Sequence, residues 1–210
     1  MTSRFYQCQR PTCRFRFPAL EVDAGYTCPK CGAPATVIND LLPSKGNVDE
    51  KDYPVTIAVL LDNIRSAYNV GSIFRTADGA GVSEIILCGI TPAPDHTGVR
   101  KTSLGAESSI PWKQTWNAMD VCREYKEAGF QIFVLEKIAG ATALPELKIG
   151  FGSSKILLIV GNENSGIDPE ILRLADNIIF IPMAGQKESL NVSVAFGICI
   201  YWMVMNSNTA

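Results

Sequence analysis

The chain has 210 residues, of which 47% are hydrophobic and 19% are charged, a composition typical of a globular protein and not of a disordered one. Its formal net charge of −2 provides no overall excess of positive charge that would indicate a nucleic-acid-binding protein. The charge is unevenly distributed: residues 1–47 contain six Lys and Arg against three Asp and Glu, and the remaining 163 residues contain thirteen against eighteen. We therefore expect a mildly basic N-terminal arm and a mildly acidic body.

The distribution of apolar residues and cysteines indicates where the protein works. The first twenty residues lack the continuous apolar segment of a signal peptide. The most apolar window, Val192 to Met205, has 14 residues and is too short to span a bilayer. Four of the seven cysteines lie near the N-terminus, which fits thiols held by a metal in a reducing compartment better than a set of disulfides. We expect a cytoplasmic protein that does not associate with membranes.

The N-terminal cysteines have the spacing of a metal site. Four residues separate Cys8 from Cys13, two separate Cys28 from Cys31, and fourteen lie between the pairs. Zinc favours four thiolates in a tetrahedron, and a segment of this size has too little core to fold without such a metal. The alternative is four ordinary buried cysteines. Residues 1–40 are therefore predicted to form a small segment that resembles the zinc ribbons of RNA- and DNA-handling proteins, with a structural zinc ion.

Basic and aromatic residues alternate in this segment, and they allow two interpretations. The side chains could grip phosphates and stack on bases of a nucleic acid. The aromatic residues could equally pack the small core of the ribbon. The residues concerned are Arg4, Phe5, Tyr6, Arg10, Arg14, Phe15, Arg16, Phe17 and Lys30.

Residues 41–54 contain turn formers, charges and two prolines and are predicted to be a linker to a body at residues 55–210. In the body, continuous apolar runs separated by helical segments predict a parallel sheet with helices on both faces, which is an α/β fold. The expected strands are residues 55–62, 84–90, 130–136, 155–161 and 177–182. The expected helices are residues 70–80, 117–128, a short one after Asp168 and Pro169, and a final one from Asn191.

Three polar, glycine-containing segments follow predicted strands, at the sheet edge where open α/β proteins bind their ligands. The first contains Asn69, expected to cap a helix, and Arg75, which is either in a salt bridge or directed into a cleft. The second contains Gly161 and Glu163 but lacks the Lys-Ser/Thr of a nucleoside triphosphatase loop. The third places Ser189 and Asn191 directly before the apolar final helix, where either could act as its cap.

These segments resemble, in order, the three motifs of SPOUT-superfamily RNA methyltransferases of the TrmH/SpoU branch. The resemblance covers residues 55–206, includes the connecting segment at residues 100–112, and implies a knotted, mostly parallel sheet with S-adenosylmethionine held in the knot of a homodimer. It also implies methylation of a ribose 2′-hydroxyl in tRNA or rRNA. The matching residues are Asn69-x-Gly-Ser-x-x-Arg75-Thr in the first segment, Gly161-x-Glu163-x-x-Gly166 in the second, and Ile181-Pro182-Met183 with Ser189-Leu190-Asn191 in the third.

The resemblance also implies roles for single residues. Arg75 would be central to catalysis, and because a guanidinium stays protonated in proteins we expect it to donate hydrogen bonds to the reacting oxygen, not to act as a base. The alternative for Arg75 is a structural salt bridge to Asp78 or Glu163. The residues expected to orient Arg75 and the substrate are Asn69, Glu163, Ser189 and Asn191. The residues expected to contact the methyl donor are Gly161, Ile181, Met183 and Leu190.

Two other functions are compatible with the same fold. One is an RNA-binding protein without catalysis, although the complete set of motif residues argues against a decayed site. The other is a methyltransferase that acts on a base nitrogen, although the first and third motifs favour the ribose.

Overall fold

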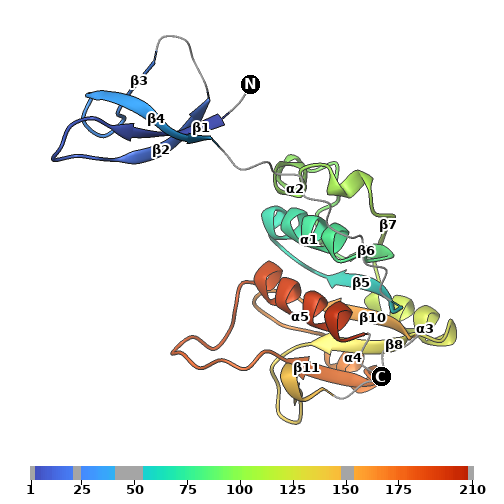
Figure 1. The fold of residues 1–210 in the computed structure, drawn as a ribbon. Helices are drawn as coiled ribbons and strands as arrows, with labels where there is room; N and C mark the ends of the chain where they lie inside the picture. The colour runs from blue at the N-terminus through green and yellow to red at the C-terminus, as the bar shows by residue number, and fades with distance from the viewer. Residues whose placement is uncertain (1–2, 21–24, 41–53, 148–153, 208–210) are drawn as a thin grey trace. The chain divides into compact units, whose positions relative to one another are not determined.

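The computed structural model describes residues 3–20, 25–40, 54–147 and 154–207. The predicted linker, apart from Pro54, lies outside these residues. The chain divides by its internal contacts into two compact units, Met1–Lys51 and Asp52–Ala210, which we call the ribbon and the body (Figure 1). Among the described residues, none of the helices has both the length and the hydropathy needed to cross a membrane.

The ribbon is a four-stranded antiparallel sheet. Its strands are β1 (Ser3–Cys8), β2 (Arg16–Leu20), β3 (Tyr26–Thr27) and β4 (Pro34–Asp40), in the order β2-β1-β4-β3. Tyr6 and Phe17 are buried in its small core, where the ring of Tyr6 lies 5.9 Å from Phe17 and 4.7 Å from Tyr26. Phe5 and Phe15 remain exposed. Two of the four aromatic residues named in the sequence analysis therefore pack the core of the ribbon, and the other two are exposed to solvent.

The body is built on a seven-stranded sheet in which every paired neighbour is parallel. The strand order is β7-β6-β5-β10-β8-β11-β9. The α/β class with a parallel sheet is confirmed. The knot stays a prediction, because strand pairing alone does not establish how the chain is threaded. The strands are β5 (Thr56–Asp62), β6 (Glu84–Cys88), β7 (Trp112–Thr115), β8 (Gln131–Leu135), β9 (Thr142–Ala143), β10 (Lys155–Val160) and β11 (Asn177–Phe180).

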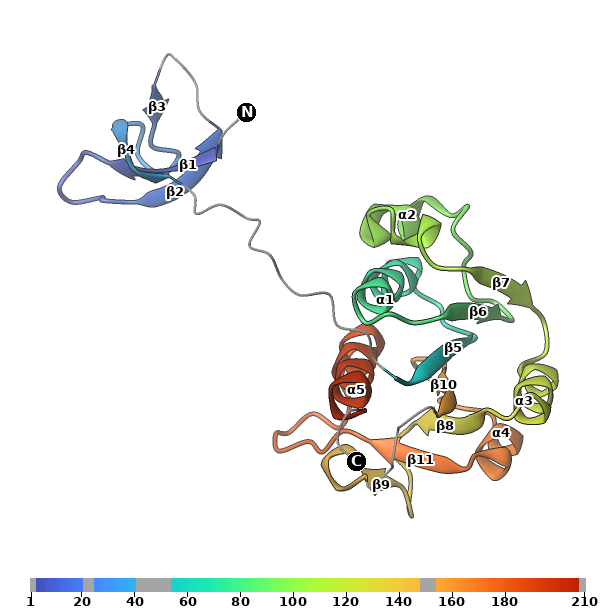
Figure 2. The same cartoon turned by 45° about the vertical axis from the view of Figure 1, so that its right-hand side comes forward.

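Helices cover both faces of this sheet (Figure 2). Alternate residues of the central strands point to opposite faces, so β5 and β10 contribute to two cores. The helices are α1 (Ala67–Gly79), α2 (Thr97–Ser103), α3 (Ala118–Glu127), α4 (Pro169–Leu174) and α5 (Val192–Asn206), with short 3-10 turns at Ala106–Ser108 and Leu144–Glu146. Val59 and Leu158 pack under α1 and α5, whereas Leu60 and Leu157 pack under α3 and α4.

Some elements differ from the sequence-based prediction. Helix α1 begins at Ala67, three residues before the predicted start, because Ser66 caps it by accepting a hydrogen bond from the main-chain N–H of Asn69. Asn69 therefore lies inside the helix, and its predicted role as the cap is wrong. Strand β7 and helix α2 were not expected, since neither has a continuous or periodic apolar pattern. Helix α5 does begin after Asn191, whose side chain accepts from the N–H of Ser193.

Candidate active site

The carboxylate of Glu163, in the loop after β10, binds the start of α1. It accepts hydrogen bonds from the main-chain N–H of Arg65 at 3.0 Å and of Ser66 at 3.3 Å. It also accepts one from the side-chain amide of Asn69 at 3.0 Å. Partial burial raises the pKa of Glu163, but these hydrogen bonds outweigh burial and lower it overall. The second predicted segment is thus tied to the first.

The third segment joins the same hydrogen-bond chain through Asn191. Its amide nitrogen donates to Oδ1 of Asn69 at 3.1 Å, while its own oxygen accepts from the N–H and the hydroxyl of Ser193 at 2.9 and 2.7 Å. The orientation of the Asn69 amide follows from this pattern, because its nitrogen faces the carboxylate of Glu163 and its oxygen faces Asn191. Three of the predicted site residues, one from each segment, therefore form one continuous chain, which we call the Asn69 chain.

A pocket of about 280 Å³ lies beside the Asn69 chain at the carboxyl ends of β8, β10 and β11. The loop between β11 and α5 forms one wall, and it extends away from the sheet before it returns to the helix (Figure 1). Most of the predicted site residues line this pocket: Gly161, Glu163, Ile181, Met183, Ser189, Leu190 and Asn191.

The absence of a side chain at Gly161 is required by the close packing of the loop that follows β10. A Cβ atom at this position would lie 2.5 Å from Cδ1 of Ile167 and 2.7 Å from the carbonyl oxygen of Gly166. Real Cβ atoms do not approach other atoms so closely, and one of these contacts is to backbone that cannot move aside. Any larger side chain would displace the loop that follows β10, and with it Glu163.

The end of β8 also lines the pocket, and the sequence analysis missed it. Leu135, Glu136 and Lys137 form this part of the wall. A pattern that could have found them was present, because polar residues follow an apolar run at the carboxyl end of a parallel strand. The segment after β8 was not selected because it contains no glycine and matches none of the three motifs.

The structure does not bring Arg75 into this pocket. Its side chain is exposed on α1, and no hydrogen bond or ion pair reaches it from the residues that the structure describes. The predicted alternative, a salt bridge to Asp78 or Glu163, is not formed either, since neither pair is among the ion pairs of the described residues. Helix α5 runs beside α1 in the same direction. Asn191 binds Asn69 at the N-terminal end of the two helices, and Tyr201 lies against Gly79 near their C-terminal end. Arg75 therefore lies on the exposed side of α1, and the neighbouring helix α5 begins at the pocket.

The four N-terminal cysteines form a second cluster, in the ribbon. The Sγ atoms of Cys8, Cys13, Cys28 and Cys31 all lie within 4.8 Å of one another. Two of the separations, Cys8 to Cys31 at 3.5 Å and Cys13 to Cys28 at 3.8 Å, are close to the roughly 3.8 Å between thiolates in a tetrahedron with zinc–sulfur bonds of about 2.3 Å. In this cluster a main-chain hydrogen bond at Ala33 lowers the pKa of Cys31 to about 7, whereas burial raises the pKa of Cys8 to about 12. The donor set fits zinc.

The body is a parallel sheet with a small-ligand pocket at the carboxyl ends of its strands. This is the position of the active site in α/β enzymes that have an open sheet. The model of the SpoU rRNA Methylase family matches residues 56–201. The chain belongs to this family. The ribbon lies outside the matched residues.

Two curated relatives illustrate the family. The 23S rRNA (guanosine-2'-O-)-methyltransferase RlmB of Haemophilus ducreyi is 30% identical to this chain over 80% of the chain and 63% of its own length. The tRNA (guanosine(18)-2'-O)-methyltransferase of Aquifex aeolicus is 33% identical over 69% of the chain and 67% of its own length. The chain spans about half to two thirds of the length of the curated relatives that it matches.

Solved structures agree with this assignment. An rRNA methyltransferase from Sinorhizobium meliloti with bound AdoMet matches with a TM-score of 0.66 and 33% identity, over 72% of this chain and 57% of that one. The TrmH/SpoU tRNA modifying enzyme of A. aeolicus matches with a TM-score of 0.64 and 29% identity, over 73% of this chain and 77% of that one. The fold and family are therefore the same by sequence and by structure.

Proposed function

We propose that this protein transfers a methyl group from S-adenosylmethionine to a ribose 2′-hydroxyl of tRNA or rRNA. The observation that carries the proposal is the Asn69 chain, because it holds one predicted catalytic residue from each of three segments beside a small-ligand pocket. The relatives support it, since those with named activities are ribose 2'-O-methyltransferases acting on guanosine in rRNA or tRNA.

The pocket has the character that S-adenosylmethionine requires. Its volume of about 280 Å³ lies just below the roughly 300–1,000 Å³ typical of small-ligand sites. Leu135, Ile181 and Leu190 offer apolar surface suited to the adenine ring, and Glu136 offers a carboxylate suited to the ligand's hydroxyl or ammonium groups. When bound, S-adenosylmethionine supplies an electrophilic methyl group. The residues around it must then hold the acceptor ribose in line with that methyl group.

We propose that Arg75 donates hydrogen bonds to the acceptor oxygen of the ribose during methyl transfer. Its guanidinium cannot act as a base at physiological pH, but its planar donors suit an oxygen that gains negative charge as the bond to carbon forms. The proton of the hydroxyl leaves through phosphate or water. Asn69, Ser189 and Asn191 orient the ribose, and Glu163 holds Asn69 in place. Because Arg75 lies outside the pocket, it must reach an acceptor that is bound over the exposed side of α1.

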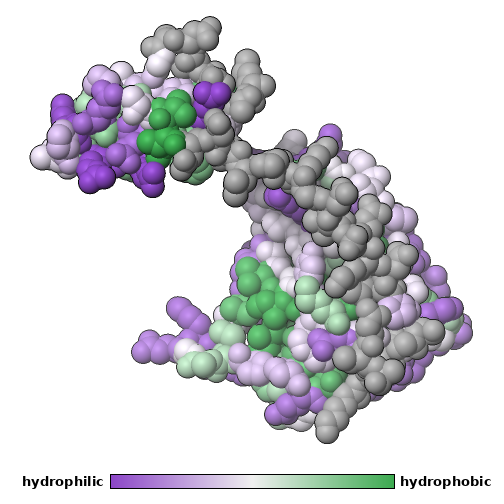
Figure 3. All heavy atoms as spheres, in the orientation of Figure 1, coloured by the Kyte–Doolittle hydropathy of each residue, from purple (hydrophilic) through white to green (hydrophobic). Residues whose placement is uncertain are grey.

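We further propose that the protein is a homodimer formed through α5. The helix carries a row of exposed apolar side chains, with Val194 50%, Ile198 43% and Met205 61% exposed. Residues at these spacings share one side of a helix. Figure 3 shows hydrophobic surface over this part of the body. A second copy that covers this row would also approach the exposed side of the adjacent α1, which carries Arg75.

The ribbon would bind one zinc ion per chain through Cys8, Cys13, Cys28 and Cys31, and the ion would stabilise a segment with a very small core. A reducing compartment such as the cytoplasm would keep these thiols available to the metal.

The test of the catalytic proposal is Arg75→Ala, assayed for a single turnover with saturating S-adenosylmethionine and RNA. Loss of a positioned donor should lower the rate constant by about 100- to 1,000-fold, while calorimetry shows little change in donor affinity. Arg75→Lys should restore little, because an ammonium lacks the planar fork. Arg173→Ala, an exposed arginine on the opposite helical layer, is the matched control. A near-normal rate for Arg75→Ala would refute the assignment.

A further inference from the structure

A second pocket lies at the same edge of the sheet, beyond the loop that begins at Asn162. Its volume is about 640 Å³, and it lies where β5, β7 and β10 end and α3 begins. Asn162 lines both pockets. Gly166 is the one residue of the family motifs that lines this second pocket, and none of the proposed catalytic residues lines it. Those used below are Asp62, Asn63, Ile90, Trp116 and Asn117.

The most buried polar group of the second pocket is Asp62, at the end of β5. Only 5% of this residue is exposed. In the part of the chain that the structure describes, its side chain accepts one hydrogen bond, from Nδ2 of Asn63 at 2.8 Å. Burial and the nearby charge of Asp168 raise the pKa of Asp62. A carboxylate can accept several more hydrogen bonds, and leaving them unmade in a buried position is unfavourable. Asp62 therefore offers a strong acceptor to a ligand that brings N–H groups.

Asn63 holds this carboxylate in a fixed position. Its backbone is left-handed, with φ of 56°, a conformation that asparagine adopts more readily than most residues other than glycine. Its Oδ1 accepts from the N–H of Ile90 at 3.2 Å, and its carbonyl oxygen accepts from Nδ2 of Asn162 at 2.7 Å. The side chain fits only because Gly89 has no Cβ atom, which would lie 2.1 Å from Oδ1 of Asn63. The acceptor is thus held rigidly before any ligand arrives.

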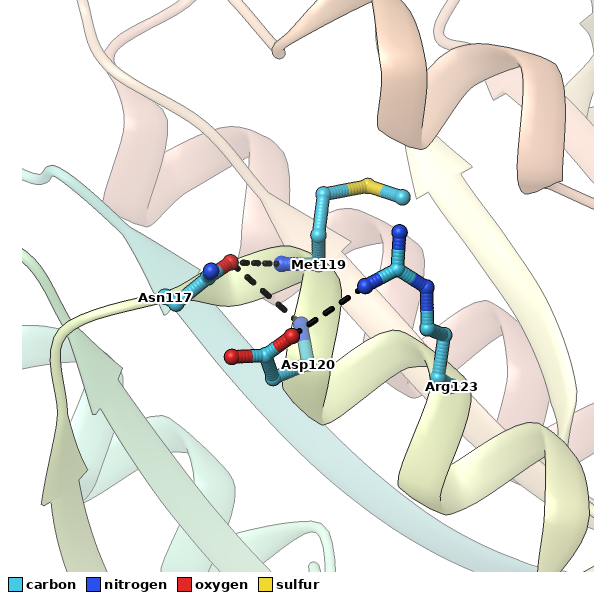
Figure 4. A network of polar contacts seen from close by, with 4 residues as sticks. All are labelled: Asn117, Met119, Asp120 and Arg123. Carbon is cyan, nitrogen blue, oxygen red and sulfur yellow. Dashed lines mark hydrogen bonds and ion pairs between the residues drawn. The ribbon is translucent and has the colours of Figure 1, made fainter.

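The rim of the pocket adds an aromatic surface and a free amide. Trp116 is 81% exposed, although a large aromatic side chain normally loses more of its surface to packing. The side-chain oxygen of Asn117 caps α3 by accepting from Met119 and Asp120 (Figure 4). Its amide nitrogen has no partner among the described residues. Arg123 lies 3.2 Å from Asp120 and compensates its charge, so the free polar group that Asn117 adds to this rim is a donor.

We propose that the second pocket binds a guanine base of the RNA, stacked on Trp116 and hydrogen-bonded to Asp62. Guanine carries two neighbouring N–H donors on its Watson–Crick edge, which match the two oxygens of a carboxylate, whereas each other base offers a single donor group there. The amide of Asn117 can donate to the adjacent guanine oxygen. The two acidic residues, Asp62 and Asp168, disfavour a phosphate in the same space. Stacking on aromatic side chains together with hydrogen bonds to the Watson–Crick edge is how proteins read unpaired RNA bases.

This inference rests on the proposed function only in that RNA is the substrate. It is tested with the full-length protein saturated with S-adenosylmethionine, so that the first pocket is filled. The probe is guanosine 5′-monophosphate, and the readout is the indole N–H resonance of Trp116, assigned from the spectrum of Trp116→Phe. Guanosine monophosphate should shift this resonance with an affinity about tenfold higher than inosine monophosphate, which lacks the exocyclic amine. The adenosine, cytidine and uridine monophosphates should bind less tightly still.

The matched variants are Asp62→Asn and Asp78→Asn. Asp62→Asn keeps the shape of the side chain and should remove the preference for guanosine over inosine monophosphate, whereas Asp78→Asn, at an exposed aspartate of α1 outside the pocket, should retain it. Equal shifts for all nucleotides, or no shift of the Trp116 resonance, would overturn the inference. Failure of S-adenosylmethionine to bind, measured separately by calorimetry, would instead count against the proposed function. The two failures are therefore distinguishable.

Discussion

Replacing Glu163 by glutamine keeps the size of the side chain and removes its charge. In the structure its carboxylate accepts from two main-chain N–H groups at the start of α1 and from the amide of Asn69. A glutamine side chain has one acceptor oxygen in place of two. Glu163→Gln therefore loses at least one of the three contacts and converts the others from charge-assisted to neutral hydrogen bonds.

The expected loss of stability follows from these contacts. A hydrogen bond to a charged group contributes about 1.5–3 kcal/mol and a neutral one about 0.5–1.5 kcal/mol, and the low end applies because Glu163 is exposed. We expect Glu163→Gln to lower the free energy of unfolding by about 1–2 kcal/mol at pH 7, similar to the loss of a helix cap. In a protein of this size this corresponds to a decrease in Tm of roughly 2–8 °C.

The assay is thermal unfolding of the full chain, followed by tryptophan fluorescence. The three tryptophans, Trp112, Trp116 and Trp202, all lie in the body, so the ribbon does not contribute to this change. The control is Glu127→Gln, an exposed glutamate at the end of α3 whose side chain has no partner among the described residues. It should leave Tm unchanged.

The pH dependence of the Tm difference between wild type and Glu163→Gln tests whether the charge of Glu163 is responsible for it. The pKa of Glu163 is lowered from its ordinary value of 4.5, because the hydrogen bonds from Arg65, Asn69 and Ser66 outweigh the effect of burial. A carboxyl with a lowered pKa in the folded state stabilises the protein above its unfolded pKa, and this contribution is lost as the pH falls through the folded value. The difference in Tm between wild type and Glu163→Gln should therefore be full at neutral pH and shrink below about pH 4.5. A difference that does not change with pH would show that the charge is not involved.

Further predictions concern the ribbon, the two pockets and the dimer. Cys28→Ser should abolish binding of one zinc per chain, measured by metal analysis, and leave the tryptophan-detected transition of the body unchanged. Gly161→Ala should weaken S-adenosylmethionine binding by more than tenfold in calorimetry, because its Cβ atom would collide with Ile167 and the backbone of Gly166. Asp62→Asn should raise Tm at neutral pH, since a raised carboxyl pKa marks a charge that opposes folding above the unfolded value. Ile198→Glu should convert a dimer to a monomer in analytical ultracentrifugation, and an unchanged sedimentation coefficient would exclude α5 as the interface.

The elements that were predicted correctly are those with a buried pattern in the sequence. Strands β5 and β10 are continuous apolar runs, and α3 begins at Ala118, one residue after the predicted start at Asn117. Strand β7, with the sequence WKQT, lies at an edge of the sheet and is mostly exposed, so no apolar pattern marks it. The start of α1 was misplaced because both Ser66 and Asn69 are good caps. In the structure Ser66 is the cap, and the side chain of Asn69 binds Glu163 and Asn191 instead.

The candidate site was predictable in its residue types and not in its contacts. Glycine and polar residues after strands indicated which segments would meet. They could not show that Glu163 binds main-chain N–H groups while Arg75 stays exposed, because these outcomes depend on distances between segments about a hundred residues apart. The second pocket was missed for the same reason, since Asp62, Trp116 and Asn162 come from three separate parts of the chain.

The burial of both faces of the central strands limits how this protein can change in evolution. Residues 57–61 of β5, and every residue of β10 after Lys155, are buried in one core or the other. A substitution at any of these positions alters the volume of a close-packed layer, and an inserted residue would exchange the two layers at once. Mutational drift in the body is therefore expected to concentrate in the edge strands β7 and β9, while the centre changes only by swaps that preserve volume.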